Sequence, residues 1–156
     1  MIPIDIPGFR VLALEHLVLD YNGTLAADGV LIDGVAEALR ALSGSLAIHV
    51  LTADTFGLAA KQLEGLPLTL DILPLANQQE AKRDRLLGYG GANCVAVGNG
   101  RNDRQMLRAA GLGIALIQRE GGAAETVAVA HVVSTSIVDA LALLRNPKRL
   151  IATLRS

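Results

Sequence analysis

The 156-residue chain has few aromatic residues and almost no cysteine. Phe, Trp and Tyr together make up 3% of it, tryptophan is absent, and Cys94 is the single cysteine. One cysteine cannot form an internal disulfide, so we expect a protein of a reducing compartment, the cytoplasm. No apolar run approaches the ~20 residues that a membrane-spanning helix needs, and the first residues lack the pattern of a signal peptide. We therefore expect neither a membrane span nor a secretory leader.

The chain also has almost no net charge. Fourteen Lys and Arg residues stand against 15 Asp and Glu residues, which gives a formal net charge of -1. That balance provides no basic surface for nucleic acid and no polybasic membrane anchor. The basic stretch Arg145–Arg155 is interpreted as a solvated or subunit-contact helix, and a homo-oligomer is possible.

Apolar residues, by contrast, make up 51% of the chain, mainly Ala, Leu and other aliphatics, with 16 glycines besides. Short apolar segments that end in turn residues alternate with segments of helical periodicity, which is typical of βαβ units around a mainly parallel sheet. The predicted strands are His16–Asp20, Leu46–Leu51, Leu68–Leu73, Asn93–Val97, Leu112–Ile117 and Ala130–Val133. We predict one domain over residues 1–156, with helices on both faces of the sheet.

Smaller features can be predicted between these strands. Alternating Ile2, Ile4 and Ile6 indicate an N-terminal β-hairpin, and the Asp28-Gly29 turn indicates a flap at about 25–33. Apolar stripes at helical spacing predict three helices, a fourth is expected to start at Asn77–Glu80 with a capping pair, and another should cover Arg104–Ala110. The stripes comprise Val35, Ala38, Leu39 and Leu42, then Phe56, Ala59, Ala60 and Leu63, and finally Ile137, Ala140, Leu141 and Leu144.

Polar side chains follow three of the predicted strands. Asp20, Asn22 and Thr24 follow the first, Thr52 and Asp54 the second, and Asn99, Asn102 and Asp103 the fourth. Parallel strands end at one edge of a sheet, and ligands of open α/β sheets bind there. Lys82 lies in the first turns of the helix before the last group. Carboxylates, a hydroxyl and a lysine at one edge can bind a phosphoryl group and Mg²⁺.

These residues occur in the order of four motifs of a known family. DYNGT at Asp20–Thr24 resembles the Asp-x-Asp-Gly-Thr motif of haloacid dehalogenase-like (HAD) hydrolases and the Asp-Lys-Thr-Gly-Thr motif of P-type ATPases. Leu51-Thr52 resembles the second motif, and Lys82 stands where the third is expected. GNGRND at 98–103 is similar to the Gly-Asp-Gly-x-Asn-Asp stretch of the ATPase phosphorylation domain. The match spans about Leu17 to Leu144 and implies a Rossmann-like HAD fold, similar to soluble, P-type-ATPase-like members.

The resemblance implies a phosphohydrolase with a set of assigned residues. Asp20 would be the nucleophile that forms an aspartyl-phosphate, and the substrate would be a phosphorylated small molecule or phosphoprotein. The implied catalytic residues are Asp20, Asn22, Thr52 and Lys82, the phosphate would contact Asp20, Gly23, Thr52, Ala53 and Lys82, and Mg²⁺ would be held by Asp20, Asn22, Asn99 and Asp103.

The chain departs from the family pattern at two acidic positions. Asn22 stands where phosphatases have a general acid and base, and an amide cannot exchange a proton near neutral pH. Loss of that help, typically worth ~10²–10⁴ in rate, implies slow turnover. Asn99 stands where an Asp usually supports the metal. The intervals Leu25–Leu51 and Ala53–Ala81 hold no cap domain, so the site would be open and the chain cannot act alone as an ion pump.

Several residues have simpler explanations. Asp54 may be a helix cap, Asn102 an N-cap and Asp103 a first-turn acid, while Lys61 is the alternative to Lys82. Cys94 and the three histidines are interpreted as packed core or edge residues. For the whole chain, the alternative function is a non-catalytic regulatory or partner-binding module, and a receiver-type phospho-acceptor is disfavoured because no acidic pair precedes Asp20.

Overall fold

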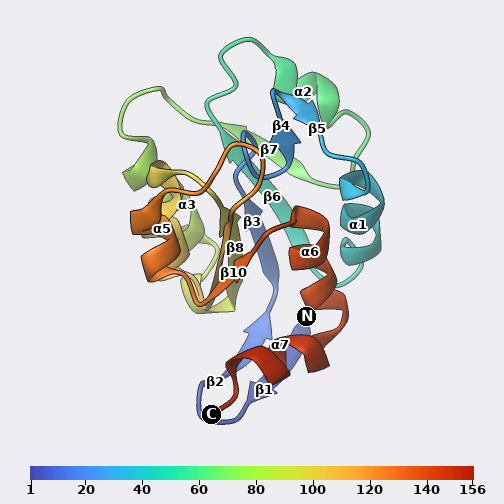
Figure 1. Ribbon diagram of the computed structural model, residues 1–156. Coiled ribbons are helices and arrows are strands. Elements are labelled where there is room, and N and C mark those ends of the chain that lie inside the picture. Colours follow the sequence, from blue (N-terminus) through green and yellow to red (C-terminus); the bar gives the residue numbers. More distant parts are fainter.

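The computed structural model describes all 156 residues and is built on a parallel six-stranded sheet (Figure 1). The strand order is β10-β9-β8-β3-β6-β7, and each neighbouring pair is parallel. The mainly parallel sheet that the sequence predicted is confirmed. Its strands are β3 (His16–Leu19), β6 (Ala47–Thr52), β7 (Thr69–Ile72), β8 (Cys94–Gly98), β9 (Leu112–Leu116) and β10 (Val132–Ser134).

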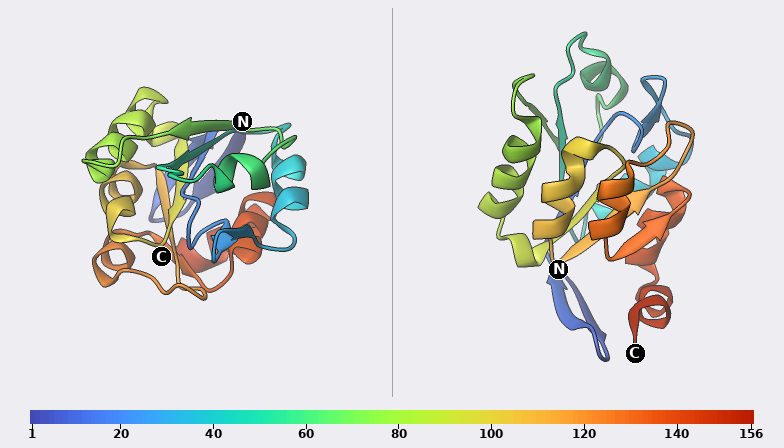
Figure 2. Two further views of the ribbon diagram at one scale, coloured as in Figure 1. Left: turned by 90° about the horizontal axis from the view of Figure 1, so that it is seen from above. Right: turned by 60° about the vertical axis from the view of Figure 1, so that its left-hand side comes forward.

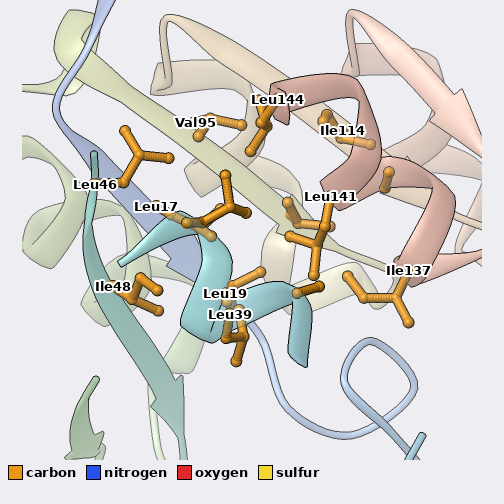
Figure 3. Close-up of a cluster of buried hydrophobic side chains, with 14 of the residues drawn as sticks. Leu17, Leu19, Leu39, Leu46, Ile48, Val95, Ile114, Ile137, Leu141 and Leu144 are labelled. Atoms are coloured by element: carbon orange, nitrogen blue, oxygen red, sulfur yellow. The ribbon is translucent and has the colours of Figure 1, made fainter. Parts of the chain in front are cut away.

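Helices cover both faces of this sheet, and alternate residues of each strand face opposite layers. Leu17 and Leu19 of β3 pack into a cluster of 30 buried residues with α1 (Val35–Leu42) and α6 (Ile137–Arg145) (Figure 3). Val18, between them, belongs to a second cluster. That cluster includes residues of α3 (Gln78–Gly88) and α4 (Arg104–Ala109), with α5 (Ala124–Val129) packed against it. Because β8 and β9 are buried at every residue, they appear in the sequence as continuous apolar runs.

The two chain ends form a separate lobe below the sheet. The antiparallel hairpin of β1 (Ile2–Ile6) and β2 (Arg10–Leu14) extends beyond the N-terminal ends of the sheet strands (Figures 1 and 2). Its alternating Ile2, Ile4 and Ile6 are buried in the same cluster as Leu150 of α7 (Pro147–Leu154). The predicted N-terminal hairpin is therefore present, and part of the basic C-terminal stretch packs on it. No helix of the chain has the length and apolar character needed to cross a membrane.

A second, short hairpin lies at the opposite end of the sheet. It consists of β4 (Ala26–Ala27) and β5 (Val30–Leu31), joined by Asp28 and Gly29, which both have positive φ. The phenol of Tyr21 donates a hydrogen bond to the Gly29 carbonyl at 2.8 Å, and the Leu31 amide donates to Gln62. The tip is therefore held against the body of the domain. We call residues 25–33 the flap.

Two local predictions were wrong. Phe56 does not belong to the apolar stripe of the second helix, because that helix, α2 (Leu58–Gln62), begins two residues later and Phe56 is 95% exposed. Gly57 precedes it at φ 71°, so the chain turns before the helix starts. Asn77 makes no capping hydrogen bond, because its own φ of 58° is left-handed rather than extended.

The histidines and the cysteine are packed as predicted. His16 and His49 share a hydrogen bond of 3.1 Å, His49 also pairs with Thr69, and His131 accepts from the Gly113 amide. Two short 3₁₀ turns, Gly91–Asn93 and Arg101–Asp103, flank β8, where Cys94 is fully buried.

Cys94 should be almost inert in the folded protein. Burial raises the pKa of its thiol to about 11, so the thiolate that reacts with disulfide reagents is scarce at pH 8. We expect slow labelling by a chromogenic aromatic disulfide in buffer and complete, rapid labelling of one thiol in denaturing urea. Rapid labelling of the native protein would contradict the packing of β8.

Candidate functional site

The carboxyl ends of β3, β6 and β8 meet around one cavity of about 680 Å³. Asp20, Thr52 and Asn99 directly follow or end these three strands, and all three line the cavity. Asn22 and Ala53 lie in the same wall. Residues 79 positions apart in sequence are thus brought together by the parallel order of the strands.

At the floor of this cavity lies a buried ion-pair triad, of which two members line the cavity and the third is fully buried. Nζ of Lys82 lies 2.8 Å from Oδ1 of Asp20 and 2.8 Å from Oδ1 of Asp103. The side chain of Lys82 is 1% exposed and that of Asp103 is fully buried. Asn102 accepts a third hydrogen bond from Nζ at 3.2 Å, so every proton of the ammonium has an acceptor. We call Asp20, Lys82 and Asp103 the triad.

Charge inside the triad shifts the pKa of its members. Burial alone would lower the pKa of the Lys82 ammonium, but the charges of Asp20 and Asp103 outweigh it and raise that pKa above its ordinary value. Burial, together with the neighbouring Asp20 charge, raises the pKa of the Asp103 carboxyl to about 6. Removing Lys82 would leave the two carboxylates without their buried counter-charge, which costs several kcal/mol, about 3–5.

Both carboxylates are also fixed by their second oxygen. Oδ2 of Asp20 accepts from the Thr24 hydroxyl at 3.0 Å. Oδ2 of Asp103 accepts from the backbone amides of Asn99 and Gly100, at 3.1 and 2.9 Å. A Cβ at Gly98 would lie 2.5 Å from the Asp103 carboxyl carbon, so only glycine fits beside this carboxylate. Asp103 is therefore held by the loop that it follows.

Asn99 is anchored as an amide. Its Nδ2 donates to the Gly121 carbonyl at 3.1 Å, and its Oδ1 lies 3.3 Å from the Thr24 hydroxyl. A carboxylate at this position would place an oxygen against the Gly121 carbonyl oxygen, since it has no proton to donate. The side chain of Asn99 also fills the space that a Cβ at Gly23 would need. The surroundings of residue 99 thus favour Asn over Asp.

The structure also decides between the alternative roles considered for Asp54, Lys61 and Asn102. Asp54 accepts from the amides of Ala59 and Ala60 at 2.8 and 3.1 Å, so it caps α2 as the simpler explanation held. Lys61 is exposed on α2, whereas Lys82 is the lysine that pairs with Asp20. Asn102 does not cap a helix with its side chain, because its amide bridges Gln78 and Lys82.

Gln118 is a site-supporting residue that sequence reasoning missed. Its Nε2 donates to the carbonyls of Gly23 and Thr24, at 3.2 and 3.1 Å, and its Oε1 accepts from the amide of Ile137 at 2.7 Å. One side chain thus ties the loop after β3 to the start of α6. These partners are backbone groups with no sequence signature, so no motif could have identified them.

The donor set around the cavity suits a hard cation. Asp20 supplies a carboxylate, and Asn22 and Asn99 supply amide oxygens, all on the cavity wall. Mg²⁺ typically takes one or two carboxylates and completes its shell with waters and phosphate oxygens. Both oxygens of Asp103 already accept hydrogen bonds, from Lys82 and from two backbone amides. Asp103 could therefore bind a cation directly only if Lys82 moved, and otherwise it would act on the cation indirectly, through the residues it holds in place.

Comparison with known proteins agrees with this geometry. Residues 83–140 match the family model for haloacid dehalogenase-like hydrolases. Two uncharacterized proteins of Methanocaldococcus jannaschii are each 46% identical to the chain, one over 61 residues and one over 39. These matches cover 39% and 25% of this chain, and the chain spans 66% and 89% of those proteins.

Solved structures show the same fold. 3-deoxy-D-manno-octulosonate 8-phosphate phosphatase of Moraxella catarrhalis, in complex with magnesium, phosphate and KDO, superposes with a TM-score of 0.72 at 17% identity, over 92% of this chain and 94% of that one. The cobalt-bound Haemophilus influenzae enzyme of that name gives 0.68 at 13% identity, over 86% and 90%. Residues 83–140 thus match a haloacid dehalogenase-like family model, and the chain has the fold of these phosphatases. The finer resemblance to P-type ATPases stays a prediction.

Gln118→Glu should loosen the loop after β3. The new carboxylate still accepts from Ile137 but faces two carbonyl oxygens, and two hydrogen bonds are lost, which costs about 1–3 kcal/mol. We expect a lower melting temperature and faster hydrogen exchange in the peptide covering residues 20–26. Gln105→Glu, which keeps its contact with Arg83, is the matched control. Equal exchange in the two variants would show that Gln118 does not hold the loop.

Proposed function

We propose that the protein is a Mg²⁺-dependent phosphohydrolase that transfers a phosphoryl group to Asp20. The observation that carries this proposal is the triad. The carboxylate of Asp20 lies at the floor of an open cavity, at the edge where the parallel strands end, and its two oxygens are held by Lys82 and Thr24. The phosphatase structures of the same fold, with bound magnesium, phosphate or cobalt, support the proposal.

The first step forms a bond between an Asp20 oxygen and phosphorus while the bond from phosphorus to the leaving oxygen breaks. Lys82 neutralises charge on the transferring group, and the Thr52 hydroxyl with the backbone at Ala53 binds its oxygens. Gly23, predicted to contact the phosphate, does not line the cavity, and its amide donates to the Ala26 carbonyl. When bound beside Asp20, Mg²⁺ would supply further positive charge for the phosphate oxygens. Water then attacks phosphorus, phosphate leaves, and the Asp20 carboxylate is restored.

Proton transfer is the weak part of this mechanism. Asn22 is exposed at the cavity wall and can donate a hydrogen bond, but it cannot give up or take a proton. The leaving oxygen therefore takes its proton from water, and water attacks in the second step without a protein base. Slow turnover and an accumulating aspartyl-phosphate follow. The substrate that this open site supports is a phosphorylated small molecule.

Asp20→Asn should abolish phosphate release, because an amide does not form the acyl-phosphate. The measurement is inorganic phosphate produced from acetyl phosphate and from a panel of phosphate monoesters, with Mg²⁺ and with EDTA. Chelation should also stop the wild-type reaction. Asp84→Asn, at an exposed carboxylate on the same helix as Lys82, is the matched control and should retain activity.

Two outcomes separate the proposal from its alternative. Turnover that is abolished by Asp20→Asn and by EDTA supports a hydrolase. If no phosphate compound is turned over and calorimetry detects no Mg²⁺ binding at millimolar concentration, the chain is instead a non-catalytic regulatory or partner-binding module.

Asn22→Asp should raise kcat. The new carboxyl group supplies the missing acid and base, a contribution of roughly 10²–10⁴ in phosphatases that have it, so we expect roughly tenfold or more. Single-turnover kinetics should show faster loss of phosphate from Asp20. A kcat equal to that of the wild type would mean that proton transfer does not limit the reaction.

A further inference from the structure

Most polar side chains in the wall of the cavity are already paired with other protein groups. Both oxygens of Asp54 cap α2, Gln78 bonds to Asn102 and to the Leu75 carbonyl, and Asn99 bonds to Thr24 and Gly121. These groups have little left to offer to hydroxyls of a substrate. Asn22 and Thr55 remain, and Asn22 lies beside the nucleophile.

The outer wall is instead apolar and exposed. Phe56, Leu58 and Leu75 line the cavity and are 95%, 39% and 69% exposed. Phe56 lies in the segment after β6, Leu58 is the first residue of α2, and Leu75 lies in the segment after β7. Scattered apolar residues on a surface need no explanation, but these three gather at the entrance of the one cavity that holds the triad. We call Phe56, Leu58 and Leu75 the rim.

Arg101 is the cation that faces the same space. Its side chain is 77% exposed and makes only a long contact with Glu125, at 3.6 Å. A guanidinium that is this weakly paired can stack on an aromatic ring. Besides Asn22 and Thr55, the groups free to contact a leaving group are therefore the three apolar side chains of the rim and one planar cation.

The cavity is also much larger than a phosphoryl group. Its volume of about 680 Å³ lies within the range of roughly 300–1,000 Å³ typical of pockets that enclose a metabolite-sized ligand. The phosphoryl group occupies the floor at Asp20, so the remaining volume takes the leaving group.

We propose, on the basis of the phosphohydrolase function above, that the preferred substrates are phosphate monoesters with an aromatic leaving group. The ring lies on the rim, with Phe56 as the main contact and Arg101 over its other face. Contact with a ring of this size removes enough apolar surface from water to favour it roughly tenfold or more over a two-carbon group.

Benzyl phosphate and ethyl phosphate test this preference, because both release a primary alcohol and so differ little in intrinsic reactivity. We expect kcat/KM for benzyl phosphate to be roughly tenfold higher or more. Phe56→Ser should lower that value several-fold and lower the value for ethyl phosphate by a smaller factor. Val11→Ser, at an apolar residue that is 75% exposed on the N-terminal hairpin, is the matched control and should change neither.

Binding of non-hydrolysable analogues separates this proposal from the proposed function. Benzylphosphonate and ethylphosphonate are titrated by calorimetry into the wild type and into Phe56→Ser. If benzylphosphonate binds more tightly than ethylphosphonate and Phe56→Ser removes the difference, the aromatic site is supported. If, in addition, no ester is hydrolysed, only the hydrolase function is overturned. The aromatic preference is overturned if benzyl and ethyl phosphate have equal kcat/KM and the two phosphonates bind with equal affinity. It is also overturned if Phe56→Ser weakens the benzyl and the ethyl compounds by the same factor. Either result would leave the hydrolase function standing.

Discussion

The ammonium of Lys82, buried between the carboxylates of Asp20 and Asp103, is the interaction on which the site depends. Two carboxylates this close would repel each other, and burial would drive one of them to take up a proton. The positive charge of Lys82 opposes the uptake of a proton by Asp103, and it lies 2.8 Å from an oxygen of each carboxylate. The helix that carries Lys82 packs against α4, which begins directly after Asp103, so the same packing that forms the second core cluster also sets the spacing of the triad.

The residues around the triad fix the direction in which Asp20 points. Thr24 binds its outer oxygen, Asn99 binds Thr24, and Gln118 binds the carbonyls of the loop from behind. Thr24 belongs to the loop after β3 itself, whereas Asn99 and Gln118 come from other segments, so the loop is defined both by its own residues and by the assembled sheet. A carboxylate held in this way would need little reorganisation to accept a phosphoryl group in the reaction proposed above. The same rigidity explains why Asn99, bonded on both sides, stays an amide.

Much of this arrangement could be predicted, because fully buried parallel strands give continuous apolar runs and parallel strands end at one edge. Asp20, Thr52 and Lys82 followed from that logic and from motif order, and they lie together. Gln118 could not be found in the same way, since a glutamine that bonds backbone carbonyls looks like any polar residue. Phe56 was misplaced because helical spacing continued across Gly57, whose positive φ delays the helix. That error hid the rim, a feature of exposed loops with no periodicity to reveal it.

The amides at positions 22 and 99 give the site its particular character. Compared with the family pattern, they replace two carboxylates by neutral amides, one of them at the position of the general acid and base, and they leave Asp20 and Lys82 in place. The expected result is a carboxylate that accepts a phosphoryl group more readily than it releases one.

Capture of the phosphorylated protein is the most direct test. After incubation with radiolabelled acetyl phosphate and Mg²⁺ and an acid quench, peptide mapping should locate a hydroxylamine-sensitive label on Asp20. Absence of label, or label on another residue, would contradict the account.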